Sequence, residues 1–229
     1  MEIYDYILEL EKRAKAASAA MNTAPDETRR AVLADLADRV EAASADILAA
    51  NALDLAAAAD NGVPTPMLDR LRLTDARLSG MAHAGRALAR LDDPVGGGKT
   101  WTTPAGLTIT ERRVPLGVVA MIFEARPNVT LDAAALCIRS GNAAVLRGGK
   151  EAIESGRAIC RVIGDALEAH GLPRDGVCFV ERTERAGADA LLTIRGYVDV
   201  LIPRGGKGLI RNVVDNAKVP TIETGAGNC

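Results

Sequence analysis

Short runs of apolar residues alternate with stretches of helical periodicity through the second half of the 229-residue chain. Continuous apolar runs are typical of strands that are buried on both faces, and helices between such strands are typical of parallel sheets. The pattern therefore predicts an α/β fold with an open parallel sheet. We expect strands at 117–123, 143–146, 176–180, 198–202 and 219–222, and helices at 130–140, 151–169, 184–194 and 205–216.

Residues 1–92 differ in composition: they are rich in Ala, Leu, Asp and Arg and poor in β-branched side chains. Their apolar positions recur at helical spacing, as at Leu33, Leu36 and Val40. Helix start signals occur at 23–25 and at 74, and the Asn-Gly pair at 61–62 is a stop signal. We expect three or four amphipathic helices here, packed on the sheet.

Residues 93–106 are rich in Asp, Pro, Gly and Thr, which indicates a connection. Residues 107–114 then alternate apolar and polar side chains, as a half-exposed strand does. A strand outside the main sheet offers an edge to which another chain can add. The chain therefore divides into N-terminal helices (1–92), a connection with its strand (93–114) and an α/β core (115–229).

The overall charge gives no reason to expect a nucleic-acid or membrane partner, because the formal net charge is only -2. Neither a signal-peptide core nor an apolar run of membrane-spanning length occurs, which favours a cytoplasmic protein. Four scattered cysteines and two histidines lack metal-ligand spacing, so no metal site is expected. Cys137 and Cys160 lie in apolar helical stretches and are predicted to be reduced, structural thiols.

Two familiar phosphate-binding motifs are absent. The segment Gly96–Thr100 (GGGKT) resembles the end of a P-loop, but the position that needs the first glycine is Asp93, whose charge would repel a phosphate. A flexible glycine connection fits this segment better. A dinucleotide fingerprint after 198–202 fails as well, because Arg211 stands in place of its third glycine.

Two other loops fit a phosphorylated ligand. Arg147-Gly148-Gly149-Lys150 follows one predicted strand and precedes a helix, and Pro203-Arg204-Gly205-Gly206-Lys207-Gly208 repeats this design after another strand. Glycines let backbone N–H groups approach an anion, and a helix N-terminus adds a favourable dipole. Two such loops indicate a ligand with separated phosphates, and NADPH has such a pair.

A third strand end, after 117–122, carries Glu124, Arg126 and Asn128. It places a carboxylate, a guanidinium and an amide at the edge of the sheet where ligands bind in folds of this kind. The alternative is a charged turn with Pro127 in the first turn of a helix.

A family resemblance rests on four segments: VPLGVV (114–119), FEARPNVT (123–130), SGNAAVLRGGKE (140–151) and LIPRGG (201–206). They resemble the gamma-glutamyl phosphate reductases, which belong to the aldehyde dehydrogenase superfamily. The resemblance is collinear from about residue 10 to Cys229. The combination of FEARPN with LRGGK is specific to this family rather than to aldehyde dehydrogenases in general.

The resemblance implies a Rossmann-like sheet of the aldehyde dehydrogenase type and NADPH-dependent reduction of gamma-glutamyl phosphate to glutamate 5-semialdehyde and phosphate, on the route to proline. In the family a cysteine thiolate attacks the acyl phosphate, a thioester forms, and the cofactor supplies a hydride. The resemblance also implies a homo-oligomeric full-length form, with 93–114 as an oligomerisation arm. Glutamate 5-kinase, which supplies the labile substrate, is an expected partner.

Site residues carried over by position fall into three groups. Those expected on the 2′-phosphate side of NADPH are Arg147, Gly148, Gly149 and Lys150, and those expected near the pyrophosphate are Pro203, Arg204, Gly205 and Gly206. Glu223 and Gly225 are expected near the nicotinamide, and Glu223 falls where many aldehyde dehydrogenases keep a general base, although a reductase that expels phosphate needs none. Glu124, Arg126 and Asn128 are expected to bind substrate.

Two departures from the family pattern bear on catalysis. Ala125 stands where the wider superfamily has an asparagine that donates to the oxyanion, and Asn128 or backbone N–H groups are the candidate replacements. The motif around Cys229 is not the family's nucleophile motif, and the nucleophilic cysteine is expected downstream of it. We therefore expect the N-terminal, cofactor-binding part of the enzyme, inactive alone. A non-catalytic interaction or regulatory protein is the alternative.

Overall fold

Four parallel strands form the central sheet of the computed structural model, which describes residues 1–223. The strands are β3 (Val118–Phe123), β4 (Ala143–Arg147), β5 (Val177–Phe179) and β6 (Val200–Arg204), in the spatial order β5-β4-β3-β6. The predicted α/β fold with a parallel sheet is thus confirmed. The fifth predicted strand, at 219–222, is reduced to an isolated parallel bridge between Thr221 and Leu201 of β6.

Helices follow the strands in the expected places: α6 (Pro127–Arg139), α7 (Ile153–Ala169), α8 (Arg185–Thr193) and α9 (Lys207–Asn216). Short 3₁₀ turns precede α7 (Lys150–Ala152) and β5 (Arg174–Gly176).

Residues 1–92 form five helices, rather than the three or four expected: α1 (Ile3–Thr23), α2 (Asp26–Ala42), α3 (Ser44–Asp60), α4 (Thr65–Leu71) and α5 (Asp75–Arg90). The stretch that ends at 61–62 is two helices, because the chain bends by 68° between α2 and α3 without a glycine or proline to signal it. Thr74 caps α5 as its sequence position suggested, and its hydroxyl accepts a hydrogen bond from the Arg77 N–H.

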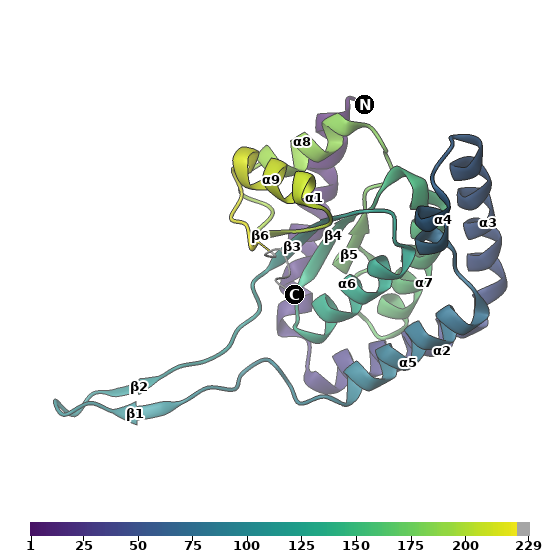
Figure 1. The fold of residues 1–229 in the computed structure, drawn as a ribbon. Helices are drawn as coiled ribbons and strands as arrows, with labels where there is room; N and C mark the ends of the chain where they lie inside the picture. Colours follow the sequence, from purple (N-terminus) through teal and green to yellow (C-terminus); the bar gives the residue numbers. More distant parts are fainter. Residues whose placement is uncertain (224–229) are drawn as a thin grey trace.

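Helices cover both faces of the sheet (Figure 1). Helix α1 packs on one face, where it also contacts α8, and α6 packs on the other face beside α7. Helices α2, α3 and α5 form a further layer on α6 and α7, so most of the N-terminal group reaches the sheet only through these two helices. The strand interiors are buried on both sides, as their continuous apolar runs predicted.

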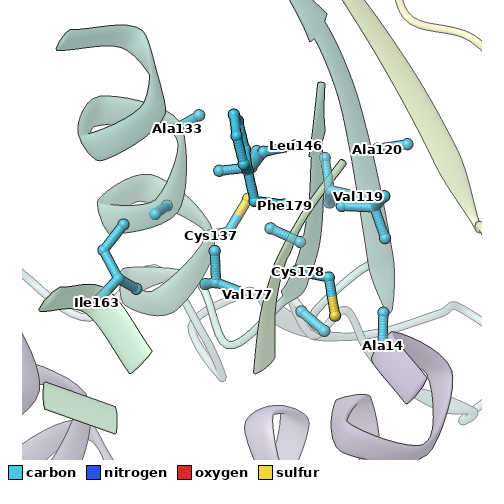
Figure 2. Packing of buried hydrophobic residues seen from close by; sticks show 14 of the residues in the cluster. Ala14, Val119, Ala120, Ala133, Cys137, Leu146, Ile163, Val177, Cys178 and Phe179 are labelled. Carbon is cyan, nitrogen blue, oxygen red and sulfur yellow. The ribbon is translucent and has the colours of Figure 1, made fainter. Parts of the chain in front are cut away.

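Small side chains let the layers approach closely in the core. Figure 2 shows Ala14 of α1 on one side of the strands and Cys137 of α6 with Ile163 of α7 on the other. Gly156 of α7 lies against the ring of Phe179, where a Cβ atom would overlap the ring carbons. The sequence therefore needs glycine at this position to seat α7 on β5.

A two-stranded antiparallel ribbon projects from the body of the protein (Figure 1). It pairs β1 (Thr100–Thr102) with β2 (Thr108–Thr110), and both strands are exposed. The predicted strand at 107–114 is shorter than expected, and its partner lies within the predicted connection. The segment from Gly96 is paired rather than a flexible connection, because the Gly96 N–H donates to the Arg113 carbonyl at 2.8 Å.

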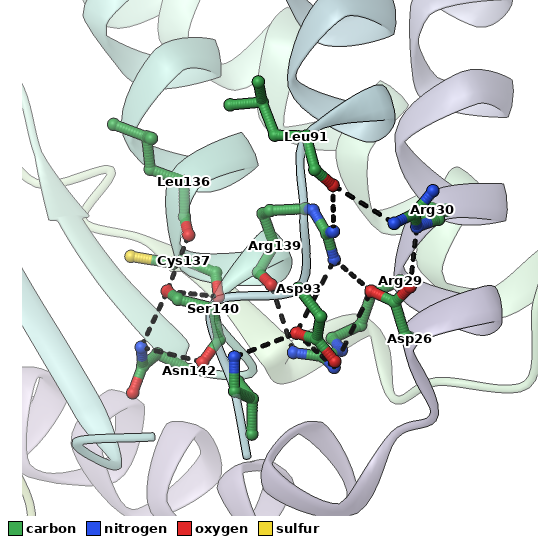
Figure 3. A network of polar contacts seen from close by, with 11 residues as sticks. Asp26, Arg29, Arg30, Leu91, Asp93, Leu136, Cys137, Arg139, Ser140 and Asn142 are labelled. Carbon is green, nitrogen blue, oxygen red and sulfur yellow. Dashed lines mark hydrogen bonds and ion pairs between the residues drawn. The ribbon is translucent and has the colours of Figure 1, made fainter. Parts of the chain in front are cut away.

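An ion-pair cluster anchors the root of this ribbon to α2 and α6 (Figure 3). The side chains of Arg29 and Arg139 are both only 3% exposed. Arg29 donates to both Asp93 carboxylate oxygens, at 2.8 and 3.0 Å, while Arg139 pairs with Asp26 and donates to the Leu91 carbonyl at 2.6 Å. Removing one partner of such a buried pair leaves an uncompensated charge, so the cluster holds the ribbon's departure point firmly.

Candidate functional site

The carboxyl ends of β3, β4 and β6 meet at one edge of the sheet. In the register of the parallel strands, Phe123 lies beside Arg204 and Ile122 lies beside Arg147. The three loops singled out in the sequence therefore leave the sheet side by side. This is the edge at which open parallel sheets of α/β proteins bind ligands.

A hollow of about 790 Å³, here called the strand-end hollow, lies beyond β3 and β6. Several residues expected at the site line it: Glu124, Arg126, Arg204, Gly205, Gly206 and Glu223. Three cations that sequence reasoning left out of the site line it as well, namely Arg70 of α4 and Lys207 and Arg211 of α9. Lys207 belongs to the motif quoted above, whereas no sequence signal connects Arg70 with this edge.

The carboxylate of Glu124 contacts the second glycine loop, at the backbone that was expected to bind an anion. Its Oε1 accepts a hydrogen bond of 2.6 Å from the Gly206 N–H, which is the N-cap of α9. The contact is close, since a Cβ atom on Gly205 would lie 2.7 Å from the Glu124 carboxyl carbon. The backbone that was expected to approach a pyrophosphate thus already holds a carboxylate. A substrate-binding role for Glu124 stays a prediction.

The first glycine loop lies at a separate hollow of about 450 Å³, the α8–α9 hollow, whose lining includes Arg147, Lys150, Glu151 and Asp189. Arg147 donates to the Glu184 carbonyl at 3.2 Å, and burial lowers the pKa of its guanidinium while Asp189 and Glu184 partly restore it. Lys150 is exposed. Residues of α9 line this hollow and the strand-end hollow, so α9 separates the two.

A carboxylate from α3 caps the helix that follows the first loop. The carboxylate of Asp54 from α3 accepts hydrogen bonds from the Glu154 and Ser155 N–H groups, at 3.1 and 2.8 Å, and from the Ser155 hydroxyl. Asp54 is 3% exposed, so this cap of α7 is enclosed. The Glu154 and Ser155 N–H groups are therefore already satisfied within the protein, and the contribution of the α7 dipole to the Arg147–Lys150 loop stays a prediction.

Asn128 lies at a third hollow of about 500 Å³, the α4–α6 hollow, lined among others by Arg70, Arg72, Arg126, Asn128 and Asp132. The Asn128 amide donates to the Asp132 carboxylate at 3.0 Å. Arg70 and Arg126 line both this hollow and the strand-end hollow. The two hollows are therefore neighbours.

The described thiols are poor nucleophiles. Cys137 and Cys178 are buried, and desolvation raises the pKa of each thiol to about 12. Burial raises the pKa of Cys160 as well. Because the thiolate is the reactive form, the reduced, structural role predicted for Cys137 and Cys160 fits their surroundings. Gly225 and Cys229 lie outside the described residues.

Two further findings concern residues 1–223. No group of three or more His, Cys, Asp or Glu side chains in this part of the chain is suited to hold a metal ion. No single helix here has the length and apolar composition to cross a membrane, and α2 with α3 meets that test only as a bent pair.

Known proteins resemble this chain in sequence and in fold. The profile of the aldehyde dehydrogenase family matches residues 7–228. The gamma-glutamyl phosphate reductase of Halothermothrix orenii is 44% identical over 230 aligned residues, which cover 100% of this chain and 55% of the relative. The reductase of Lacticaseibacillus casei is 58% identical over 167 residues, covering 72% of this chain and 40% of the relative.

Among solved structures, the crystal structure of gamma-glutamyl phosphate reductase from Thermotoga maritima superposes with a TM-score of 0.94 at 38% identity. The match covers 97% of this chain and 54% of that structure. The chain thus spans about half the length of the curated relatives it matches.

Proposed function

Because the chain belongs to the aldehyde dehydrogenase family, we propose that it supplies the cofactor-binding part of an NADPH-dependent reductase of gamma-glutamyl phosphate. The products are glutamate 5-semialdehyde and phosphate, on the route to proline. The observation that carries the proposal is the pair of cationic glycine loops at two hollows on either side of α9. When bound, the cofactor supplies the hydride that reduces the acyl carbon.

The residues of the two loops suit the two phosphate-bearing parts of NADPH. Arg147 and Lys150 place cations at the α8–α9 hollow, where they would hold the 2′-phosphate. Gly205 and Gly206 would approach the pyrophosphate. The Gly206 N–H already donates a hydrogen bond to an anion, the carboxylate of Glu124, which stands in for a phosphate oxygen. Since Glu124 is exposed, its side chain is free to leave this position when a phosphate arrives.

The acyl-transfer half of the reaction needs a group beyond those described. A cysteine thiolate is proposed to receive the acyl group from gamma-glutamyl phosphate, and the raised pKa values of Cys137, Cys160 and Cys178 make these thiols unsuitable. Because the motif around Cys229 is not the family's nucleophile motif, we expect no reductase turnover from the 229-residue chain alone. Glutamate semialdehyde-dependent reduction of NADP by this chain would contradict that expectation. The role of Glu223 near the nicotinamide stays a prediction, as does the cytoplasmic location.

The test of the cofactor proposal is a calorimetric comparison of NADPH and NADH. The chain is expected to prefer NADPH by about tenfold or more, because charge-assisted hydrogen bonds to the 2′-phosphate add about 1.5 kcal/mol or more. Lys150→Glu is expected to abolish the preference. Lys99→Glu, the same charge reversal on the ribbon, is the matched control and is expected to retain it. Equal affinity of the unmodified chain for both nucleotides would contradict the assignment of the Arg147–Lys150 loop.

The ribbon supports a second, compatible role in assembly. Its exposed apolar side chains include Trp101 (47% exposed), Leu107 and Ile109, and an isolated two-stranded ribbon is only marginally stable in water. We propose that residues 93–114 contact another copy of the protein, as an oligomerisation arm. Gel filtration distinguishes an oligomer from a monomer, and the expected result is a defined oligomer at low protein concentration. Glutamate 5-kinase as a partner stays a prediction.

A further inference from the structure

Arg70 and Arg72 line the α4–α6 hollow from a segment, residues 70–73, in which every second side chain is buried. Leu71 and Leu73 are 1% and 7% exposed, whereas Arg70 and Arg72 are exposed and line the hollow. Asn51 of α3, itself 1% exposed, fixes this alternation. Its amide donates to the Leu71 carbonyl at 2.9 Å, and its Oδ1 accepts from the Leu73 N–H at 2.7 Å. The outward direction of both arginines is therefore set by buried hydrogen bonds.

A second attachment holds the same segment from the other side. The guanidinium of Arg77 in α5 donates to the carbonyls of Asp69 and Arg72 and faces the Asp69 carboxylate at 3.3 Å. Arg77 is thereby engaged in holding the backbone. Within residues 1–223, the guanidinium groups of Arg70 and Arg72 make no hydrogen bond or ion pair. They are positioned donors available to an anionic ligand.

A carboxylate lies at the same hollow. Asp132 of α6 uses Oδ2 to accept the Asn128 amide. Loss of water around the Asp132 carboxyl raises its pKa, since Asn128 and the charge of Arg204 offset the desolvation only in part. A cation placed beside Asp132 would favour its charged form. Within residues 1–223, the hollow thus combines the unpaired guanidinium groups of Arg70 and Arg72 with a carboxylate that lacks a cationic hydrogen-bond partner.

We propose that the α4–α6 hollow binds the zwitterionic head group of an α-amino-acid substrate. Arg70 and Arg72 hold its α-carboxylate and Asp132 holds its α-ammonium group. The volume of about 500 Å³ lies in the range of small-molecule sites. Because Arg70 and Arg126 also line the strand-end hollow, a side chain that extends from this head group would bring its activated carboxyl end toward the nicotinamide side. This inference rests on the proposed function and identifies which end of the substrate the chain recognises.

The experiment is calorimetric titration of the 229-residue chain and its variants with three probes. L-glutamate carries both head-group charges, glutarate lacks the ammonium group, and γ-aminobutyrate lacks the α-carboxylate. L-glutamate is expected to bind at least about tenfold more tightly than either analogue. Arg72→Gln is expected to weaken L-glutamate and glutarate alike, whereas Asp132→Asn is expected to weaken L-glutamate and leave glutarate unchanged. Arg161→Gln, at an exposed arginine on α7, is the matched control and should change neither.

The outcomes separate this inference from the cofactor proposal. If the chain binds NADPH but not L-glutamate, or if Arg72→Gln and Asp132→Asn both leave L-glutamate binding unchanged, the head-group site is overturned and the cofactor proposal stands. If L-glutamate binds with the expected dependence on both variants while NADPH does not bind, the head-group site stands and the cofactor proposal fails. Circular dichroism of each variant shows whether a loss of binding reflects a loss of folding.

Discussion

A buried carboxyl on α1 lowers the stability of this protein at neutral pH, and replacing it should reveal by how much. Glu11 is 0% exposed, and within residues 1–223 neither of its carboxyl oxygens has a hydrogen-bond partner. Burial raises its pKa from 4.5 to about 8. At pH 7 the folded protein therefore carries this group protonated, whereas the unfolded chain carries it ionised.

The magnitude follows from the difference between pH 7 and the unperturbed pKa. Holding the group protonated across about 2.5 pH units costs about 3 kcal/mol, at 1.36 kcal/mol for each unit. Because the folded pKa lies above the unfolded one, stability is greatest below about pH 4.5 and falls as the pH rises toward about 8. Glu11→Gln removes the ionisable group, keeps its shape, and should raise the free energy of unfolding by up to about 3 kcal/mol at pH 7.

The assay is urea unfolding of both proteins, followed by circular dichroism at pH 5 and pH 8. The advantage of Glu11→Gln should grow from under about 1 kcal/mol at pH 5 to about 4 kcal/mol at pH 8. Glu9 is an exposed glutamate on the same helix that pairs with Lys12; Glu9→Gln is the control, and its effect should stay within about 1 kcal/mol at both pH values. An advantage of Glu11→Gln that is the same at pH 5 and pH 8 would refute the reasoning.

Three other substitutions test separate parts of the structure. Glu124→Gln should tighten NADPH binding about tenfold in calorimetry, because a phosphate no longer competes with a charged carboxylate for the Gly206 N–H; unchanged or weaker binding would contradict this. Asp54→Ala should lower the free energy of unfolding by about 2–4 kcal/mol in urea titrations, because it removes the buried acceptor of three hydrogen bonds; a loss below about 1 kcal/mol would contradict the cap. Trp101→Ser should shift gel-filtration elution toward the single chain, and an unchanged oligomer would exclude Trp101 from the contact.

The four strands of the central sheet were predictable because their interiors are buried on both faces. An apolar run such as Ala143–Leu146 does not alternate with polar residues. This pattern can be recognised in the sequence without knowing which strands or helices pack against it. The ribbon was harder, since Thr100–Thr102 is short, exposed and surrounded by glycine and threonine. The bend between α2 and α3 has no local signal either, because helical periodicity continues across Ala43.

The loops at the strand ends were predictable, whereas the carboxylates that contact the following helices were not. Glycines and cations that follow apolar runs are visible in sequence, so the position of Arg147–Lys150 and Pro203–Gly206 at strand ends could be predicted, while their binding roles stay predictions. The carboxylates that cap the two following helices come from far away, since Glu124 and Gly206 are separated by 82 residues and Asp54 and Ser155 by 101. Such pairings depend on tertiary structure, as does the approach of Arg70 to the strand-end hollow.

The two glycine loops are proposed to hold one phosphorylated dinucleotide across α9. A crystal structure of this chain with NADP⁺ tests this proposal most directly. We expect the 2′-phosphate between Arg147 and Lys150, the pyrophosphate at the Gly206 N–H, and the Glu124 carboxylate displaced from that N–H. A nucleotide bound elsewhere, with Glu124 still accepting the Gly206 hydrogen bond, would contradict the claim.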